Sequence, residues 1–221
     1  MSAVSDVEAG TGQRRLAAIT GGGSGIGQAT AYRLSMDGFD VAILDIDKAR
    51  AETVARSVTD RNGSAFPVWI DVTDSSSVED AFAAVEAWRK APDVLVNSAG
   101  IMRVSSIVDC TLTDFRTVMD VNVTGAFLCA QRASKRMLAQ RYGRIVNLSS
   151  ISAERAGIGR VAYGTSKGAV ASLTRASRSC RLNRGFLPSF FATATMMRSK
   201  SLAARCTTSK WPLVNGSKLP G

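Results

Sequence analysis

The sequence contains no histidine, and its four cysteines lie far apart along the chain. Zinc sites are built mainly from closely spaced cysteine and histidine ligands, so we expect no metal site. A nucleophile triad that uses histidine as its base is excluded outright. We expect the cysteines to be reduced packing residues of a cytoplasmic protein: Cys110, Cys129, Cys180 and Cys206.

Long apolar runs are missing as well. No run approaches the roughly 18 residues that a membrane-spanning helix needs, so no membrane partner is expected. Residues 1–13 contain Asp6 and Glu8 and have no apolar centre, which argues against a secretory signal. The 221 residues are 45% hydrophobic and 21% charged, values that fit one globular domain and exclude a disordered or fibrous chain.

Acidic residues are absent after Glu154, although the chain has 18 of them. The net charge of +10 therefore comes mainly from residues 178–221, while the preceding residues are close to neutral. A basic segment is one signature of binding to nucleic acid or to a membrane surface. Here the Lys and Arg residues are scattered without a dense cluster, so a nucleic-acid partner is disfavoured.

Short apolar runs alternate with segments of helical spacing over most of the chain. The predicted strands are 16–20, 41–45, 66–70, 94–97 and 144–148. The predicted helices are 26–36, 48–61, 75–88, 113–138 and 160–179. Ser75 or Ser76 would cap the third helix, with Glu79 paired to the cap. Strands separated by helices form parallel βαβ units, so we expect an α/β fold with a doubly wound parallel sheet and helices on both faces.

Residues 20–27 read TGGGSGIG and lie between a predicted strand and a predicted helix. Glycines allow a tight turn and let a pyrophosphate approach the backbone, and the N-terminus of the following helix offers free N–H groups. The pattern predicts a dinucleotide site with these candidate residues: Gly21, Gly23, Ser24, Gly25, Ile26 and Gly27. A glycine turn with no ligand stays the simpler alternative.

Asp45 ends the strand that follows the glycine loop and its helix. A carboxylate at this place accepts hydrogen bonds from the ribose hydroxyls and repels a 2′-phosphate. No Arg or Lys lies inside the glycine loop or directly after Asp45. The residues therefore favour NAD(H) over NADP(H), against the alternative of an ordinary surface aspartate.

Tyr163 and Lys167 lie four residues apart, on one face of a predicted helix. A nearby ammonium group stabilises the phenolate form of a tyrosine, which can then act as general acid or base on an alcohol or a carbonyl. The predicted strand before this helix runs on into Ser150, thirteen residues before Tyr163. A strand end and a helix start converge over the carboxyl edge of such a sheet, where ligands bind.

Taken together, the motifs resemble the short-chain dehydrogenase/reductase family over residues 16–177. The glycine loop is similar to the family's TGxxxGxG loop, and Asp71-Val72 resembles the pair that meets the adenine ring. Residues 97–100 resemble the family's NNAG motif, with Ser98 replacing its second asparagine. The cofactor-binding residues that the resemblance adds are Asp71, Val72, Asn97, Ala99, Gly100, Tyr163 and Lys167. The residues that match the catalytic tetrad are Asn122, Ser150, Tyr163 and Lys167.

The resemblance implies a Rossmann fold, a nicotinamide cofactor and reversible oxidation of an alcohol to a carbonyl. Tyr163 would exchange a proton with the substrate oxygen, and Lys167 would also hold the nicotinamide ribose. Ser150 would hydrogen-bond the substrate oxygen, and Asn122 would help to hold a water that links Lys167 to solvent. The resemblance further implies a homo-oligomer, a tetramer or a dimer, in which the long helices around 113–138 and 160–179 pack against their symmetry mates.

Residues 178–221 depart from the family pattern. A member would continue with an apolar strand and a Pro-Gly turn, but Pro188 interrupts the apolar run 187–193 and no Pro-Gly follows. We therefore divide the chain into an N-terminal extension (1–13), an NAD-binding and catalytic domain (14–177) and an atypical basic segment (178–221). We predict that the last strands of the sheet are missing or disordered. A shifted reading frame or a damaged gene end would explain the segment, and a divergent but functional C-terminus is the alternative.

Three functions follow from these patterns. The first is an NAD(H)-dependent enzyme that interconverts a secondary alcohol and a ketone. The second is a catalytically impaired member of the family that at most binds nucleotide, and the third is a nucleotide-binding regulator or a nucleic-acid binder. The small-molecule substrate is open among sugars, hydroxyacyl groups, steroids and cyclic alcohols.

Overall fold

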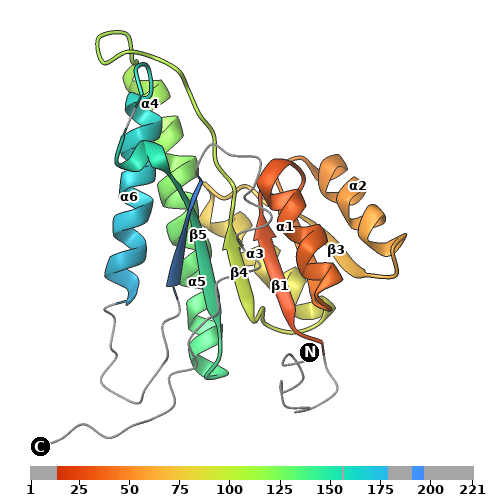
Figure 1. Ribbon diagram of the computed structural model, residues 1–221. Coiled ribbons are helices and arrows are strands. Elements are labelled where there is room, and N and C mark those ends of the chain that lie inside the picture. The colour runs from red at the N-terminus through yellow and green to blue at the C-terminus, as the bar shows by residue number, and fades with distance from the viewer. Residues whose placement is uncertain (1–13, 156, 179–190, 197–221) are drawn as a thin grey trace, which may run out of the picture.

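A single parallel sheet of six strands organises the part of the chain that the structure describes, residues 14–155, 157–178 and 191–196 of this computed structural model. The spatial order of the strands is β3-β2-β1-β4-β5-β6 (Figure 1). Their bounds are β1 (Leu16–Thr20), β2 (Asp40–Asp45), β3 (Ser64–Trp69), β4 (Val94–Asn97), β5 (Arg144–Ser150) and β6 (Phe191–Met196). This order is that of the dinucleotide-binding Rossmann fold, so the predicted fold is confirmed.

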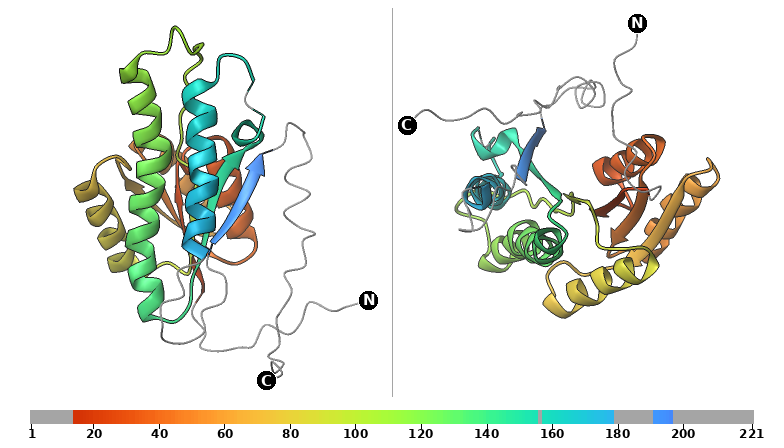
Figure 2. Two further views of the ribbon diagram at one scale, coloured as in Figure 1. Left: turned by 90° about the vertical axis from the view of Figure 1, so that its left-hand side faces the viewer. Right: turned by 90° about the horizontal axis from the view of Figure 1, so that it is seen from below.

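Helices cover both faces of the sheet (Figure 2). The helices are α1 (Gly25–Met36), α2 (Lys48–Thr59), α3 (Ser75–Trp88), α4 (Leu112–Met119), α5 (Gly125–Ala139) and α6 (Val161–Arg178). α1 and α2 pack on one face, and α3, α5 and α6 pack on the other. No helix within the described ranges is long and apolar enough to cross a membrane.

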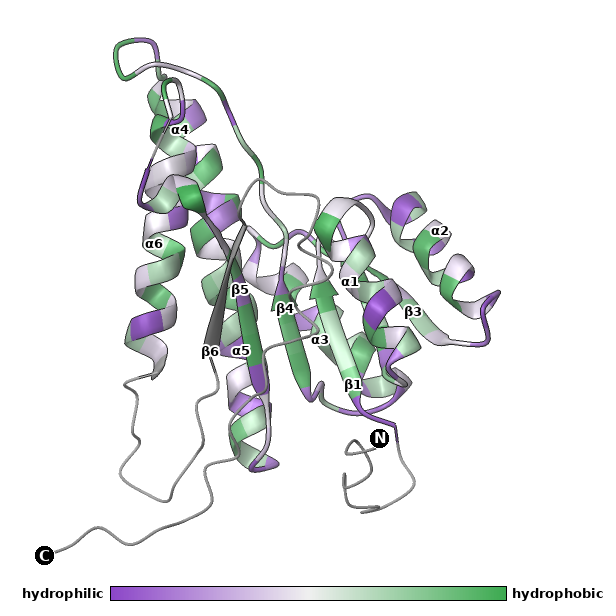
Figure 3. Cartoon of the chain, viewed as in Figure 1, coloured by the Kyte–Doolittle hydropathy of each residue, from purple (hydrophilic) through white to green (hydrophobic). Residues whose placement is uncertain are grey.

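Two apolar cores fill the space between the sheet and its helices. Every residue of β1 and β2 is buried, because a parallel strand between two helical layers is covered on both sides. One core joins the sheet to α3 and α5 and includes Phe82, Cys129 and Met137, and the other joins it to α1 and α2. The hydropathy colouring shows the same hydrophobic strands at the centre (Figure 3). Burial raises the pKa of the Cys129 thiol to about 12, as expected for a packing residue.

The chain between α4 and α5 does not form the single helix that the sequence predicts. A π-helical turn, η1 (Asp120–Thr124), joins the two helices and carries the buried Asn122. π-helical turns inside α-helices occur frequently at functional sites. Helical spacing continues through the turn, so the apolar pattern by itself could not reveal it.

The N-cap of α3 is Asp74, and the prediction of Ser75 or Ser76 is wrong. Asp74 has an extended backbone, and its side chain accepts a hydrogen bond from the N–H of Ser76. The predicted partner of the cap, Glu79, instead forms an ion pair with Arg132 of α5, with 2.7 Å between Oε2 and Nε. An Asp directly before two serines competes for the cap, and its carboxylate is the stronger acceptor for the helix N–H groups.

A sixth strand exists, so the prediction that the last strands of the sheet are missing or disordered is wrong for residues 191–196. β6 pairs in parallel with β5 and begins opposite Ile145 at Phe191. Pro188, which argued against a strand, precedes the paired residues, and its own position lies outside the described residues. A proline disturbs a strand only where its missing N–H is needed for pairing. The expectations for 179–190 and 197–221, including a shifted reading frame, also lie outside the described residues.

Replacing Phe82 by alanine tests the core on the α3 side. Phe82 is fully buried between α3 and the sheet, and its removal leaves a cavity that the rigid layers cannot close. We expect Phe82→Ala to lower the free energy of unfolding by about 3–5 kcal/mol in urea titrations. Met36→Ala is the control, because Met36 is 79% exposed and its removal should change stability by less than about 0.5 kcal/mol. Equal effects of the two variants would contradict this packing.

Candidate functional site

A cavity of about 510 Å³ opens at the carboxyl edge of the sheet. It lies where β1 and β4 are neighbours and the strand order reverses, which is the place where ligands bind in doubly wound sheets. The cavity is bordered by the segments that follow β1 to β4 and by α6. Of the residues predicted from the sequence, it is lined by Gly21, Ser24, Gly25, Ile26, Asp45, Asp71, Val72, Ala99, Gly100, Tyr163 and Lys167.

The glycine loop fits its place because side chains have no room there. Gly21 has φ +63°, and a Cβ on it would come within 2.8 Å of the backbone of Ala99. A Cβ on Gly27, in the first turn of α1, would overlap the carbonyl oxygen of Gly21. Ser24 is the N-cap of α1 but makes no side-chain hydrogen bond to the helix. The N-terminus of α1 therefore keeps N–H groups for a ligand at the cavity.

Asp45 is tied to the glycine loop and faces the same cavity. Its Oδ2 accepts a hydrogen bond of 2.9 Å from the N–H of Gly23, and its Oδ1 accepts one of 2.9 Å from the N–H of Asp47. The side chain is 8% exposed. Gly23 itself does not line the cavity, and a Cβ on it would come within 2.8 Å of Cβ of Arg50 and 2.9 Å of Oδ2 of Asp45.

Arg50 is a cavity-lining residue that the sequence reasoning missed. It lies five positions after Asp45, inside α2, outside the glycine loop and the residues directly after Asp45. Asp47 is the N-cap of α2 and accepts a hydrogen bond from the N–H of Arg50. An Asp three residues before an Arg at a helix start is the signal that would have placed Arg50 in the first turn, beside Asp45.

Two of the predicted cofactor residues lie below the cavity. Gly27 packs against the glycine loop, as described, and Asn97 is 5% exposed at the end of β4. The Asn97 amide donates a hydrogen bond of 2.8 Å to Oδ1 of Asn147 on β5 and one of 3.2 Å to the carbonyl of Ala126 on α5. Asn97 therefore joins two strands and a helix, and the residues that follow it reach the cavity.

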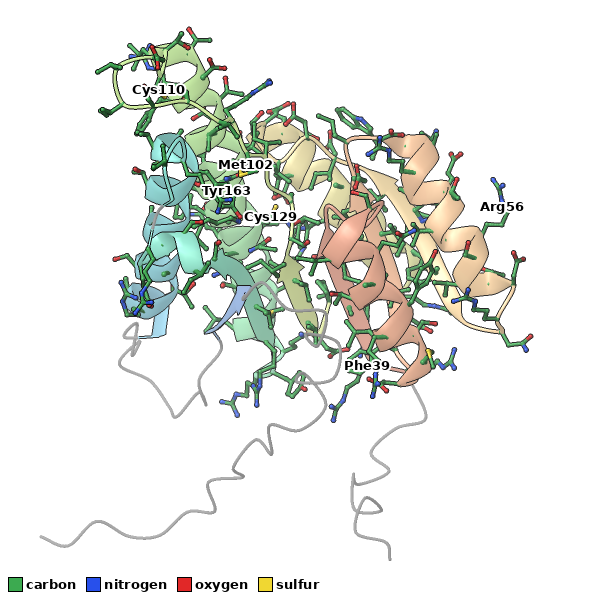
Figure 4. All side chains as sticks on the ribbon, turned by 45° about the horizontal axis from the view of Figure 1, so that its top comes forward. Phe39, Arg56, Met102, Cys110, Cys129 and Tyr163 are labelled. Atoms are coloured by element: carbon green, nitrogen blue, oxygen red, sulfur yellow. The ribbon has the colours of Figure 1, made fainter. Side chains whose placement is uncertain are left out.

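Lys167 and Tyr163 face the cavity from α6, at the end away from Asp45. The ammonium of Lys167 lies 5.7 Å from the ring centroid of Tyr163 and donates a hydrogen bond of 2.9 Å to the carbonyl of Leu148. Burial lowers the pKa of Lys167 to about 8, because removal from water disfavours its charged form. Figure 4 shows Tyr163 projecting from α6 toward the segment that follows β4.

Asn122 lies beside Lys167, under the segment that follows β4. Its side chain exchanges two hydrogen bonds with the backbone of Ile101, of 2.8 and 2.9 Å, and donates a third to Oγ of Ser166. A Cβ on Gly100 would come within 3.2 Å of Oδ1 of Asn122 and 3.5 Å of Nζ of Lys167. The fold thus brings Asn122, Tyr163 and Lys167 together.

Ser150 lies at the end of β5, next to Ser149, which borders the cavity of Tyr163 and Lys167. It lines a neighbouring cavity of about 260 Å³, between the end of β5, the 3₁₀ turn η2 (Ile151–Ala153) and α6. Its Oγ accepts a hydrogen bond of 3.1 Å from the N–H of Ser152. Ser149 lines both cavities, and its hydroxyl donates to the carbonyl of Lys167.

The geometry agrees with a comparison of the sequence with protein families. Residues 15–185 match the family described as short chain dehydrogenase. The chain therefore belongs to the short-chain dehydrogenase family.

Among relatives, the chain is 34% identical over 164 residues to a 3-oxoacyl-[acyl-carrier-protein] reductase of Aquifex aeolicus, covering 74% of this chain and 66% of the relative. It is 37% identical over 169 residues to the short-chain reductase protein NovJ of Streptomyces niveus, covering 76% of this chain and 64% of the relative. The matched part thus spans slightly less than two thirds of the length of these relatives.

Solved structures show the same likeness. A putative gluconate dehydrogenase from Agrobacterium tumefaciens superposes with a TM-score of 0.73 at 33% identity, over 75% of this chain and 65% of that one. An NAD⁺-bound xylitol dehydrogenase superposes with a TM-score of 0.72 at 35% identity, over 74% of this chain and 64% of that one. At these identities the likeness extends beyond the general fold to the family.

The close packing of the glycine loop predicts the effect of Gly27→Ala. The added methyl group would overlap backbone atoms of Gly21, so the loop itself must move. We expect a fall of about 2 kcal/mol or more in the free energy of unfolding, measured in urea. Gly157→Ala is the matched control, because its methyl group would meet no atom closer than 3.9 Å. If Gly27→Ala were as stable as Gly157→Ala, the loop would not be packed as described.

Burial of Lys167 predicts a pH dependence of stability. Its pKa is lowered from 10.5 to about 8, so between these pH values the unfolded chain binds more protons than the folded chain. The contribution of this residue to the free energy of unfolding therefore rises with pH across that window. The variant Lys167→Met lacks this rise. Its free energy of unfolding minus that of the unchanged chain should therefore fall by up to about 3 kcal/mol between pH 8 and pH 10.5.

Urea titrations at half-unit pH steps measure this difference. Lys135→Met is the control, because Lys135 is exposed on α5. A difference between Lys167→Met and the unchanged chain that stays constant with pH would show that Lys167 is not buried as a cation.

Proposed function

We propose that this chain is an NAD(H)-dependent oxidoreductase that interconverts a secondary alcohol and a ketone by hydride transfer. One observation carries the proposal: the glycine loop with Asp45 and the pair Tyr163 and Lys167 line the same cavity. The cavity thus has a dinucleotide site at one end and a proton-transferring group at the other. The interconversion of an alcohol and a carbonyl compound needs both.

The residues present fit a nicotinamide dinucleotide. The glycines at 21 and 27 let the loop pack closely against its neighbours, and the open N-terminus of α1 at the cavity suits a pyrophosphate. Asp45 would accept hydrogen bonds from the adenosine ribose, and Asp71 and Val72 would border the adenine. The remaining cofactor contacts would come from the residues after β4 and from α6: Ala99, Gly100, Tyr163 and Lys167. The NAD⁺ named with the xylitol dehydrogenase supports this assignment.

When bound, the nicotinamide would supply or accept the hydride. The hydroxyl of Tyr163 would exchange a proton with the substrate oxygen. Lys167, with a pKa of about 8, carries its proton at neutral pH and would stabilise the phenolate that Tyr163 becomes. Asn122 would hold a water that links Lys167 to solvent, and Ser150 would hydrogen-bond the substrate oxygen from the neighbouring cavity.

The names of the relatives support the class of substrate. The 3-oxoacyl reductase is named for a keto group, and xylitol and gluconate bear secondary alcohols. A secondary alcohol or its ketone is the chemistry common to all three, and it is the chemistry we assign to this chain.

We extend the proposal to assembly as a homo-oligomer. Apolar side chains remain exposed along α4 and α5, with Leu112 61%, Phe127 43% and Leu138 39% accessible. The family's oligomers pack these helices against a symmetry mate, which would cover the three side chains. Size-exclusion chromatography with light scattering should give a dimer or a tetramer.

A catalytically impaired protein is the second candidate. One observation favours it: Ser150 lines the neighbouring cavity, whereas Tyr163 lines the cavity with the glycine loop. Such a protein would bind NADH without oxidising or reducing any substrate.

Tyr163→Phe separates the two candidates. We expect the unchanged chain to bind NADH more tightly than NADPH in fluorescence titrations, with a matching rise of the thermal melting midpoint. In a panel of sugar alcohols, hydroxyacyl esters, steroids and cyclic alcohols, Tyr163→Phe should lower kcat/KM by about 10²–10⁴-fold. NADH affinity should stay within about twofold, because the variant loses only a proton-transferring hydroxyl.

Tyr142→Phe is the matched control. Tyr142 lies just before β5, at the amino ends of the strands, whereas the cavity lies at their carboxyl ends. NADH binding without turnover on any substrate would establish the impaired protein instead. Absence of binding to both NADH and NADPH would refute both candidates.

A further inference from the structure

Three charged residues gather at the end of the cavity where β2 passes into α2. Asp45 ends β2, Asp47 caps α2, and Arg50 lies in the first turn of that helix. Asp45 and Arg50 both line the cavity. Of the described residues that line it, the cations are Arg50 and Lys167, and Lys167 lies at the other end, beside Tyr163. Arg50 is thus the cation available to an anionic group near Asp45.

Asp47 holds Arg50 by both its backbone and its side chain. Oδ1 of Asp47 accepts a hydrogen bond of 3.1 Å from the N–H of Arg50, and Oδ2 lies 3.0 Å from its Nε. Cβ of Arg50 also lies close over Gly23, since a Cβ built on Gly23 would come within 2.8 Å of it. The guanidinium is therefore neutralised by a carboxylate while it stays at the rim of the cavity.

The pairing decides what the guanidinium can bind. A free guanidinium recognises phosphate strongly, through charge and paired N–H groups. A guanidinium already paired with a carboxylate offers less to a second anion, and Asp47 adds a negative charge that repels the anion. Both effects act against a phosphate on the ribose that Asp45 would bind, and neither acts on a ribose with free hydroxyls.

We propose that Asp47 is a specificity-determining residue for the cofactor, because it withholds Arg50 from a ribose 2′-phosphate. The inference rests on the proposed function, in which Asp45 binds the adenosine ribose of NAD(H). Asp45 then excludes the phosphate directly, and Asp47 excludes it by pairing with Arg50, the cation that lines the cavity at this end among the described residues. Releasing Arg50 should open the site to NADPH without weakening NADH.

Asp47→Asn tests this with little change to the fold. Asparagine keeps the acceptor that caps α2 and removes the charge that pairs with Arg50. In fluorescence titrations we expect the Kd for NADPH to fall about fivefold, the order of effect that an exposed ion pair gives, and the Kd for NADH to stay within twofold. Asp47→Ser, which also keeps a capping side chain, gives the same test if Asp47→Asn does not fold.

Two further variants identify the source of the change. Arg50→Met keeps the apolar stem over Gly23 and removes the guanidinium, so the double variant with Asp47→Asn should lose the gain for NADPH. Asp37→Asn is the matched control, because Asp37 forms a similar exposed ion pair with Arg33, of 2.9 Å, at the far end of α1. This control should leave both affinities unchanged.

Each contrary result has a distinct meaning. An unchanged Kd for NADPH in Asp47→Asn, with NADH still bound, would overturn this inference alone. A gain for NADPH that persists in the double variant would also overturn it, because the cause would then be the lost negative charge and not Arg50. If the unchanged chain bound neither cofactor, or preferred NADPH, the proposed NAD(H) function would fail together with the inference.

Discussion

A series of side-chain hydrogen bonds ties the end of β1 to the helix that carries Tyr163, and the site depends on it. The hydroxyl of Thr20, at the end of β1, accepts hydrogen bonds from the N–H groups of Ser98 and Ala99. Two residues further on, the backbone of Ile101 is held by Asn122. Asn122 donates to Ser166, whose hydroxyl donates in turn to the carbonyl of Tyr163. Residues from four separate elements are thus fixed relative to one another. The contacts are possible because glycine at position 21 lets β1 and the segment after β4 approach closely.

The price in free energy of this arrangement is the burial of Lys167. Its ammonium is removed from water, and among the described residues it meets a carbonyl oxygen and an aromatic ring rather than a carboxylate. A buried cation without an ion-pair partner destabilises the fold, and its pKa falls toward neutrality as a result. Strain and uncompensated charge that persist in an otherwise well-packed fold are typical of functional sites.

Much of the fold could be predicted from the sequence, because each element carries its own pattern. The apolar runs gave β1 and β4 with their bounds, and the glycine loop could only lie between a buried strand and a helix. The prediction failed where competing local signals were close together. Asp74 displaced the two serines after it as the cap of α3, and the turn at Asp120–Thr124 interrupted a helical pattern without changing its spacing. For β6, Pro188 lies three residues before the pairing that begins at Phe191, so the local pattern argued against a strand that the tertiary structure forms.

By itself, the sequence determined the alternation of strands and helices, the glycine loop, Asp45 and the pair Tyr163 and Lys167, because each of these is a local pattern in the chain. Only the tertiary structure decided which of these residues share a cavity. It brought Arg50 to the rim beside Asp45, moved Asn97 below the site into contact with Asn147, and put Ser150 on the neighbouring cavity. These outcomes depend on the register of neighbouring strands and on the direction in which each helix leaves its strand. Both are set by packing between segments far apart in the sequence, which no local pattern records.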